Sequence, residues 1–351
     1  MKLDPKVYEL LHEGTVIPAL PLALNADRKF DERRQRALVR YYMAAGAGGL
    51  AVAVHSTQFA IRDKDINLFE PVLRVAMEEM TSAEAPQPFI KIGGICGPTE
   101  QAVQEAELLA DLGYDLGLLS MGGLDQYSEA EVLERAKAVA EVIPLVGFYL
   151  QPSVGGRVYS YDFWKEFVNI PAVKAIKIAP FNRYFSQDVV RAVCSSPRRD
   201  DIALYTGNDD NIVVDLLTPF RFNIDGKLVE KRIVGGLLGH WAAWTKKAVE
   251  LLDRIKEVRD QDQIPAELLQ LGVEITDCNA AFFDPFHDFA GVIPGIHEVL
   301  RRQGLLEGIW CLDPEETLSP GQLEEIDRVY KAYPHLNDDD FVKENLEKWL
   351  A

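Results

Sequence analysis

Histidine, cysteine and basic residues are scarce in this sequence of 351 residues, and each shortage excludes a class of protein. The 4 cysteines are far apart and form no C-x-x-C pair, which excludes a disulfide framework and a zinc knuckle. The 6 histidines include no H-x-H pair. Lysine and arginine number 37 against 55 aspartates and glutamates, so no basic stripe is present to neutralise the phosphates of a nucleic acid.

Long apolar runs are also missing. No run is long enough to cross a bilayer, and residues 1–5 contain no apolar segment of the kind that begins a signal peptide. No G-x-G-x-x-G follows the first expected strand, which disfavours a dinucleotide-binding sheet. We therefore expect a cytoplasmic protein with no nucleic-acid or membrane partner, and the hydrophobic share of 48% is ample for a core.

Short apolar strands alternate with helical segments eight times in the first 259 residues, after a short N-terminal helix. Each unit takes roughly 25–30 residues, which favours a closed (β/α)8 TIM barrel over an open sheet. Residues 260–351 carry mainly helical signals, and we expect them to form a C-terminal helical segment packed on the barrel. The strands are expected at 15–24, 48–54, 88–95, 116–121, 144–150, 173–180, 202–207 and 232–239.

Capping residues mark several helix starts. Asp31 is expected to cap the helix that runs to residue 45. Ser128 with Glu131 forms a capping box at the start of the helix expected at 128–142. In the C-terminal segment, Ser319 followed by Pro320 predicts a helix start, with a cap and a proline just inside it. Residues 222–226 are expected to form a turn.

The strand at 173–180 carries a lysine near its C-terminal end. Alternation places Lys177 on the same face as Val173, Ala175 and Ala179. In a parallel barrel strand that face points into the packed interior, where an ammonium group is costly unless it is paired or used. Lys177 is therefore the candidate reactive group, and Lys91, which lies earlier in its own strand, is the main competitor.

Active sites of such barrels are formed by side chains at the C-terminal ends of the strands. Each candidate taken alone also fits a plain structural role: a solvated lysine, a core tyrosine, a helix cap or a rim histidine. Their convergence on one face of one barrel favours a site. The candidates by position are His55, Ser56, Thr57, Tyr149, Gln151, Ser153, Lys177, Thr206, Gly207, Asn208, Gly235 and Gly236.

A lysine in an apolar barrel mouth has a lowered pKa, because burial disfavours the charged form. The neutral amine can attack a substrate carbonyl and form a Schiff base, which needs no metal and no cofactor. Tyr149 is the expected proton shuttle, with Ser56 or Thr57 as a relay.

The run of residues 147–153 (GFYLQPS), followed 28 positions after Tyr149 by Lys177 in Ala-Ile-Lys, resembles the dihydrodipicolinate synthase / N-acetylneuraminate lyase family. In that family the tyrosine lies in a Y-N-x-P-S type motif and the Schiff-base lysine in a G-I-K type motif. The resemblance implies a class I lyase or aldolase acting on pyruvate, another 2-oxo acid or an aldehyde through a covalent imine on Lys177. It also implies a homodimer or homotetramer.

Further matches extend the resemblance. Residues 54–58 (VHSTQ) occupy the place of the family's carboxylate-binding G-T-T-G-E loop, and residues 206–210 (TGNDD) resemble its S-G-D-D segment. On this basis Ser56 is expected to be catalytic, and the substrate-binding residues are expected to be His55, Thr57, Gln151, Gly207 and Gly236, the two glycines leaving room for substrate. Residues 293–297 and 304–306 resemble the family's tail.

Departures from the family pattern mark a divergent branch. The arginine that follows P-S in the synthases is Val154 here, and Arg157 three residues on is a candidate substitute. The P-P-Y-Y segment is replaced by residues 121–124 (MGGL), so the tyrosine that some members lend to a neighbouring subunit is missing. The substrate and the direction of reaction stay open.

Two rivals remain. A barrel that has lost catalysis would bind a small oxo acid as a sensor, in keeping with the altered carboxylate loop. A metal-dependent enzyme would draw its ligands from a scattered set: His55, His240, Asp277, Asp284, His287 and Asp288.

Overall fold

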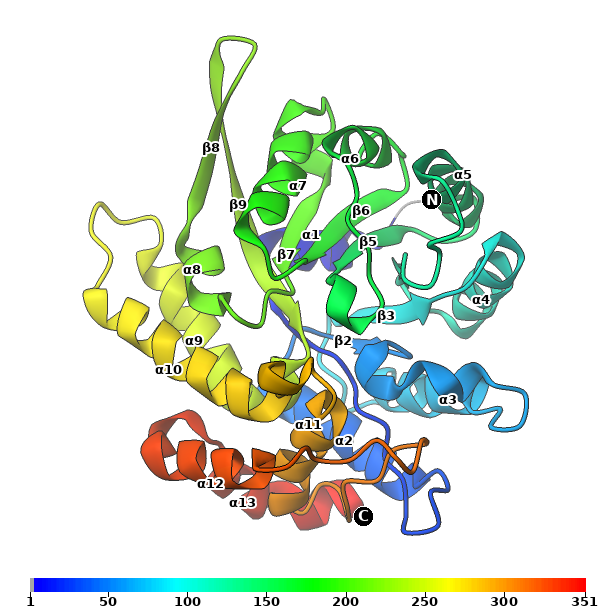
Figure 1. Ribbon diagram of the computed structural model, residues 1–351, viewed down its shortest axis with the longest axis vertical. Helices are drawn as coiled ribbons and strands as arrows, with labels where there is room; N and C mark the ends of the chain where they lie inside the picture. The colour runs from blue at the N-terminus through cyan, green and yellow to red at the C-terminus, as the bar shows by residue number, and fades with distance from the viewer. Residues whose placement is uncertain (1–2) are drawn as a thin grey trace.

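The computed structural model, which describes residues 3–351, contains a closed barrel of eight parallel strands surrounded by helices (Figure 1). The strand order is β1-β9-β7-β6-β5-β4-β3-β2, and the ring closes where the amide of Leu20 donates to the carbonyl of Ala51 at 2.9 Å. The predicted (β/α)8 fold is therefore confirmed. The strands are β1 (Val16–Pro18), β2 (Gly49–Val52), β3 (Ile90–Ile95), β4 (Leu116–Leu119), β5 (Leu145–Leu150), β6 (Val173–Ala179), β7 (Ala203–Thr206) and β9 (Lys227–Leu238).

The outer helices start where the capping residues predict. The side chain of Asp31 accepts from the amide of Arg34 at 3.0 Å, and Ser128 and Glu131 form the expected capping box. The short helix α1 (Pro5–Glu13) precedes the barrel. The helices around the barrel are α2 (Glu32–Ala45), α3 (Phe69–Met80), α4 (Thr99–Leu112), α5 (Glu129–Ala140), α6 (Tyr161–Phe167), α7 (Arg183–Ser195), α8 (Ile212–Leu217) and α9 (Thr245–Val258).

An antiparallel hairpin extends from the barrel and was not expected. Strand β8 (Pro219–Ile224) pairs with the first half of β9, so the strand predicted at 232–239 begins five residues earlier. The expected turn is present, with Asp225 and Gly226 at positive φ. The hairpin extends away from the barrel in Figure 1. In β8, Phe220, Phe222 and Ile224 alternate with Arg221 and Asn223 and are half-buried against the core, so a period-two signal was present in the sequence.

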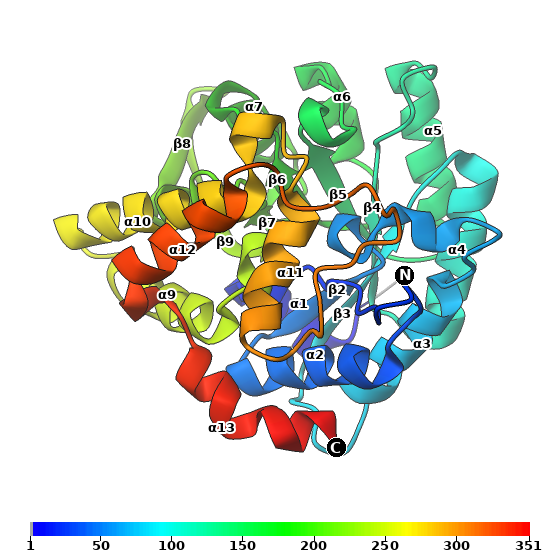
Figure 2. The ribbon, with the colours of Figure 1, turned by 60° about the horizontal axis from the view of Figure 1, so that its bottom comes forward.

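Four helices follow the barrel: α10 (Ala266–Phe283), α11 (Val292–Arg302), α12 (Gln322–Ala332) and α13 (Asp339–Leu350). Figure 2 shows α11 in front of the barrel with α10 and α12 beside it, whereas α13 packs against α2. The long helix α10 was not anticipated as a separate element. The predicted start of α12 at Ser319 is also corrected, because Gly321 at φ 85° is the N-cap.

Two apolar layers are separated by the barrel wall. The inner layer fills the barrel and includes Ala175 and Ala179 of β6, whereas Ile176 and Ile178 pack outward against the helices. The predicted alternation of β6 is therefore confirmed. Within residues 3–351, each helix is too short or too polar to cross a membrane.

Candidate active site

Lys177 points into the barrel near the C-terminal end of β6. Its side chain is only 8% exposed, and its Nζ lies 4.3 Å from the centre of the Phe148 ring, which faces it from β5. In the described chain, residues 3–351, no ion pair or hydrogen bond to another side chain holds this Nζ. A buried amine without a fixed partner is available for chemistry.

A cavity of about 60 Å³ surrounds the end of the Lys177 side chain. Most of its wall is apolar, and the ends of α10 and α11 close it from above. Five polar side chains face it, and two glycines complete the wall. The polar residues are His55, Ser56, Gln151, Lys177 and Asp209; the apolar ones include Phe148, Leu150, Val154, Phe181, Phe283, Phe289, Val292 and Ile296.

Gly207 lies directly beside the lysine. A Cβ at this position would be 2.6 Å from the Cε of Lys177 and 2.7 Å from the Cβ of Ala179. The glycine therefore makes room for the stem of Lys177. Gly207 also lines the cavity, and our expectation that it leaves room for substrate stays a prediction.

Asp209, on the loop after β7, is the second ionisable group of the cavity. Its side chain is 5% exposed, and its Oδ1 accepts one hydrogen bond, from the backbone amide of His240 at 2.9 Å. Burial raises the pKa of Asp209 above its usual 3.8, and burial lowers the pKa of Lys177 below its usual 10.5; each charge partly opposes the shift of the other.

The shifts of Asp209 and Lys177 bring their two titrations toward neutral pH. The cavity can therefore hold a neutral amine and a carboxyl group that exchanges protons. Asp209 lies in the segment that resembles S-G-D-D, but no role was predicted for it. Its acidic type and its place after β7 were the available signals; its burial was not visible in the sequence.

His55 and Ser56 follow β2 and face the cavity as expected. Burial, reinforced by the charge of Lys177, lowers the pKa of His55 to about 4, so its ring is neutral at neutral pH. The Ser56 hydroxyl donates to the carbonyl of Leu20 at a long 3.3 Å. These groups, with the amide of Gln151, are neutral hydrogen-bonding partners for a substrate.

Two predicted substrate-binding residues lie outside the cavity. Thr57 is fully buried, and its hydroxyl donates to the carbonyl of Leu20 at 2.7 Å and accepts from the amide of Val54. A Cβ on Gly236 would be 2.5 Å from the Trp241 ring, so this glycine makes room for an indole and not for a substrate. Both predictions are corrected.

Tyr149 is not brought beside Lys177. Phe148 and Leu150 face the barrel interior, so Tyr149 between them faces the outer layer under α6 and α7. Its ring packs 5.1 Å from that of Trp164, and its hydroxyl accepts from the amide of Tyr159 at 3.4 Å. Burial raises the pKa of Tyr149 to about 12. The expected proximity of this tyrosine to the lysine is therefore corrected.

Two other cations considered from the sequence lie elsewhere. Arg157 donates to the carbonyls of Leu124 and Tyr127, at 3.2 and 2.7 Å, so it does not replace the arginine missing at Val154. Lys91 pairs with Asp115 at 2.8 Å near the start of β3, away from the C-terminal strand ends.

The candidate metal ligands are dispersed. The ring of His240 contacts Asn279 and stacks on Phe282, Asp277 pairs with Arg328, and Asp284 pairs with His287 at 2.6 Å. Across residues 3–351, no three His, Cys, Asp or Glu side chains converge as a metal site.

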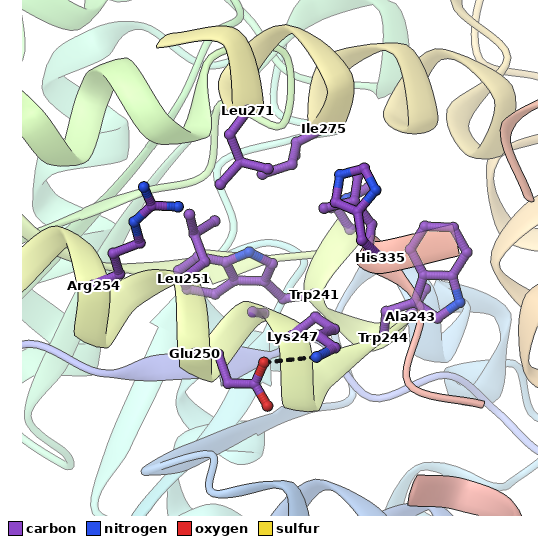
Figure 3. Close-up of a pocket in the computed structure, with 13 residues that line it drawn as sticks. Trp241, Ala243, Trp244, Lys247, Glu250, Leu251, Arg254, Leu271, Ile275 and His335 are labelled. Atoms are coloured by element: carbon purple, nitrogen blue, oxygen red, sulfur yellow. Dashed lines mark hydrogen bonds and ion pairs between the residues drawn. The ribbon is translucent and has the colours of Figure 1, made fainter. Parts of the chain in front are cut away.

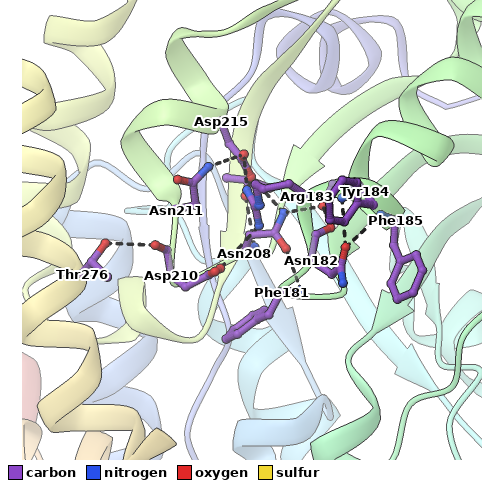
Figure 4. Close-up of polar contacts among 12 residues, drawn as sticks. Phe181, Asn182, Arg183, Tyr184, Phe185, Asn208, Asp210, Asn211, Asp215 and Thr276 are labelled. Carbon is purple, nitrogen blue, oxygen red and sulfur yellow. Dashed lines mark hydrogen bonds and ion pairs between the residues drawn. The ribbon is translucent and has the colours of Figure 1, made fainter.

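A second buried carboxylate, in the following helix α8, has a different surrounding (Figure 4). Asp215, 3% exposed, accepts from the hydroxyl of Thr206 at 2.7 Å, from the amide groups of Asn208 and Asn211, both at 2.9 Å, and from Arg183 Nη1 at 2.7 Å. We call these five residues the β7 lock. It ties the start of α7 to the loop that carries Asp209.

The β7 lock also fixes the end of the lysine strand. The side-chain oxygen of Asn208 accepts from the amide of Phe181, a non-glycine residue held at φ 49°. Phe181 lines the cavity just beyond β6. The lock therefore positions both loops that frame Lys177.

Comparisons with known proteins found one curated relative and many solved structures with a similar fold. No family model matches the chain. An N-acetylneuraminate lyase of Citrobacter koseri is 24% identical over 314 residues, which are 89% of this chain and 94% of that relative.

Solved structures share the fold at low identity. The N-acetylneuraminate lyase of Fusobacterium nucleatum complexed with pyruvate has a TM-score of 0.71 at 16% identity and covers 92% of this chain and 98% of its own. Dihydrodipicolinate synthase of Oceanobacillus iheyensis has a TM-score of 0.73 at 17% identity, with 94% and 99% covered.

Proposed function

Because the chain is a divergent member of the dihydrodipicolinate synthase / N-acetylneuraminate lyase family, we propose that it is a class I lyase in which Lys177 forms an imine with a 2-oxo acid. The observation that carries this proposal is the buried lysine, which has no fixed partner and whose pKa is lowered by burial. An amine of that kind is a nucleophile near neutral pH, whereas a solvated lysine is protonated.

Asp209 is the proposed proton carrier. Neutral Lys177 attacks the C2 carbonyl, and the proton lost from nitrogen passes to the Asp209 carboxylate. The protonated carboxyl gives that proton to the alkoxide oxygen, which becomes the hydroxyl of the carbinolamine. The second nitrogen proton then passes through the same carboxyl group to this hydroxyl, which leaves as water and yields the neutral imine. A carboxyl group whose pKa is raised toward neutral serves both directions of this transfer.

The substrate proposed is small. The cavity of about 60 Å³ is well below the roughly 300–1,000 Å³ of typical ligand sites, so a pyruvate-sized 2-oxo acid is favoured over a bulky one. No cationic group other than Lys177 faces the cavity among the described residues. The substrate carboxylate is therefore assigned to the neutral groups His55, Ser56 and Gln151.

Reductive trapping tests the proposal. The protein is incubated with pyruvate and borohydride, which reduces an imine to a stable amine, and the intact mass is measured. We expect one reduced pyruvyl group on the wild-type chain and none on Lys177→Met. A wild-type chain that gains no mass from pyruvate, other 2-oxo acids or aldehydes would contradict the proposal.

A binding protein is the second candidate, because Val154 replaces the carboxylate-binding arginine and Tyr149 faces away from the cavity. Thermal-shift screening with 2-oxo acids separates the two. Stabilisation by an oxo acid without trapping and without turnover supports a sensor, whereas trapping supports the lyase.

A further inference from the structure

A second and larger cavity lies between α9 and α10, outside the barrel (Figure 3). Its volume is about 250 Å³, close to the lower end of the roughly 300–1,000 Å³ range of small-molecule sites. We call it the α9–α10 groove. It is lined by Trp241, Trp244, Lys247, Glu250, Leu251, Arg254, Leu271, Ile275, His335 and their neighbours.

The floor of the α9–α10 groove contains an unused hydrogen-bond donor. Trp241 is 1% exposed, and its six-membered ring packs against Gly236 of the barrel. Figure 3 shows the indole nitrogen on the side of the ring that faces Leu271 and Ile275. In the described part of the chain this N–H has no acceptor. Because Trp241 lines the open cavity, this donor is available to a ligand with an acceptor.

The rim of the groove carries an excess of positive charge. Lys247 pairs with Glu250 at 2.8 Å, which leaves Arg254 as the additional cation among the lining residues. Arg254 is 46% exposed and has only a 3.4 Å contact with Glu267 outside the groove. An exposed contact of that length holds a guanidinium weakly, so Arg254 is able to turn to a carboxylate.

We propose that the α9–α10 groove binds a small monocarboxylate with a flat or branched apolar group. The apolar group packs between Trp241 and the side chains of Leu271 and Ile275. The N–H of Trp241 donates to an oxygen of the ligand, and Arg254 faces its carboxylate. Each part of this ligand matches one feature of the groove. The apolar group matches the apolar walls, the acceptor matches the N–H of Trp241, and the carboxylate matches Arg254.

The groove and the lysine cavity share one segment of chain. The side chain of His240 lines the groove, while its backbone amide holds the carboxylate of Asp209 at 2.9 Å. Gly239, the preceding residue, lines the lysine cavity. A ligand that moves His240 therefore changes the hydrogen bond from the His240 amide to the Asp209 carboxylate. Among the described residues, this is the only hydrogen bond that Asp209 accepts from outside its own loop.

Isothermal titration with phenylacetate tests the site, and it does not depend on the proposed reaction. We expect millimolar or tighter binding by the wild-type protein. Leu271→Trp fills the groove and should weaken binding at least ten-fold; Trp241→Phe and Arg254→Gln should each weaken it about two- to five-fold. Arg221→Gln, on the exposed hairpin, is the matched control and should bind as the wild type does.

Neutral phenylacetamide tests the charge preference and should bind several-fold more weakly in the wild type but not in Arg254→Gln. No heat at millimolar phenylacetate, or unchanged binding by Leu271→Trp, would overturn the site. The link to Asp209 rests on the proposed function: saturating phenylacetate should change the trapping rate at Lys177 at least two-fold. Binding without such a change overturns only the link through His240.

Discussion

Asp209 lies on the loop after β7 and Asp215 lies in the short helix α8 that follows it. Both side chains are almost fully buried, at 5% and 3% exposed. Asp215 accepts from four side chains, among them the guanidinium of Arg183. The carboxylate of Asp209 accepts a single hydrogen bond, from the backbone amide of His240. The two carboxylates are therefore similarly buried, and they differ in the number and the charge of their partners.

That difference separates a structural carboxylate from a reactive one. A buried carboxylate whose oxygens are occupied by several donors holds the backbone around it. A buried carboxyl with few donors has a raised pKa and exchanges its proton readily, as does the partnerless amine of Lys177. The β7 lock maintains the geometry, and the adjoining pair is left free for chemistry.

The largest effect is expected at the lysine. Lys177→Met removes the nucleophile, so borohydride trapping of pyruvate should fall to the background while the circular dichroism spectrum is unchanged. Lys174 lies near the start of the same strand and its Nζ donates to the carbonyl of Pro171. Lys174→Met is therefore the matched control and should trap pyruvate as the wild type does. Residual trapping by Lys177→Met would place the imine on another lysine.

Asp209→Asn should slow turnover by about 10²–10⁴-fold, the usual contribution of a general acid–base group, because an amide cannot carry the proton. Steady-state rates on the substrate identified by trapping provide the measurement. Asp210→Asn changes the next carboxylate, which faces Arg183 outside the cavity, and should have little effect on the rate. Equal losses in the two variants would argue against a special role for Asp209.

Asp209→Asn should also shift the pH dependence of trapping at Lys177, in a defined direction. Trapping should increase with pH as Lys177 loses its proton, with a midpoint below 10.5 because burial lowers this pKa. The Asp209 carboxylate favours the ammonium form, so Asp209→Asn should shift the midpoint to lower pH. An unchanged midpoint, or one at higher pH, would show that the two groups do not interact.

Asp215→Ala should reduce stability rather than intrinsic chemistry. Arg183 is 37% exposed and can turn to water, but the buried donors of Thr206 and Asn208 would lose their acceptor. An unsatisfied buried donor costs about 1–3 kcal/mol, measured as a lower urea midpoint of unfolding. Asp209→Asn should change stability by less than about 1 kcal/mol, since only one hydrogen bond is affected. A larger loss for Asp209→Asn than for Asp215→Ala would reverse the proposed assignment of the two carboxylates.

The smallest effect is expected at Tyr149. Tyr149→Phe removes a hydroxyl that accepts one long hydrogen bond in the outer layer, so trapping should change less than about two-fold and stability by less than about 1 kcal/mol. Single-turnover trapping rates provide the test. A loss of a hundred-fold or more would show that this hydroxyl reaches the lysine, as the family resemblance implies.

The sequence was sufficient for the barrel and for the orientation of Lys177. Eight strand–helix units have a period that few other folds share, and period-two alternation placed Lys177 with Ala175 and Ala179 on the inner face. The β8–β9 hairpin was missed although Phe220, Phe222 and Ile224 alternate with polar residues, and only its turn was predicted.

The site itself was less predictable, for a physical reason. Strand β5 is apolar on both faces, so its sequence does not say whether Phe148 or Tyr149 points inward, and one step of register reverses the choice. Asp209 and Asp215 are the same residue type, six positions apart in the segment after β7. Their roles depend on which donors the fold brings to each, which no local pattern encodes.

Peptide mapping of the borohydride-reduced pyruvate adduct tests the central claim most directly. The account predicts one modified peptide, the one that contains Lys177, and no modification of the peptide with Lys91, which is paired with Asp115. A reduced pyruvyl group on Lys91 or on another lysine, or no adduct on any peptide, would contradict it.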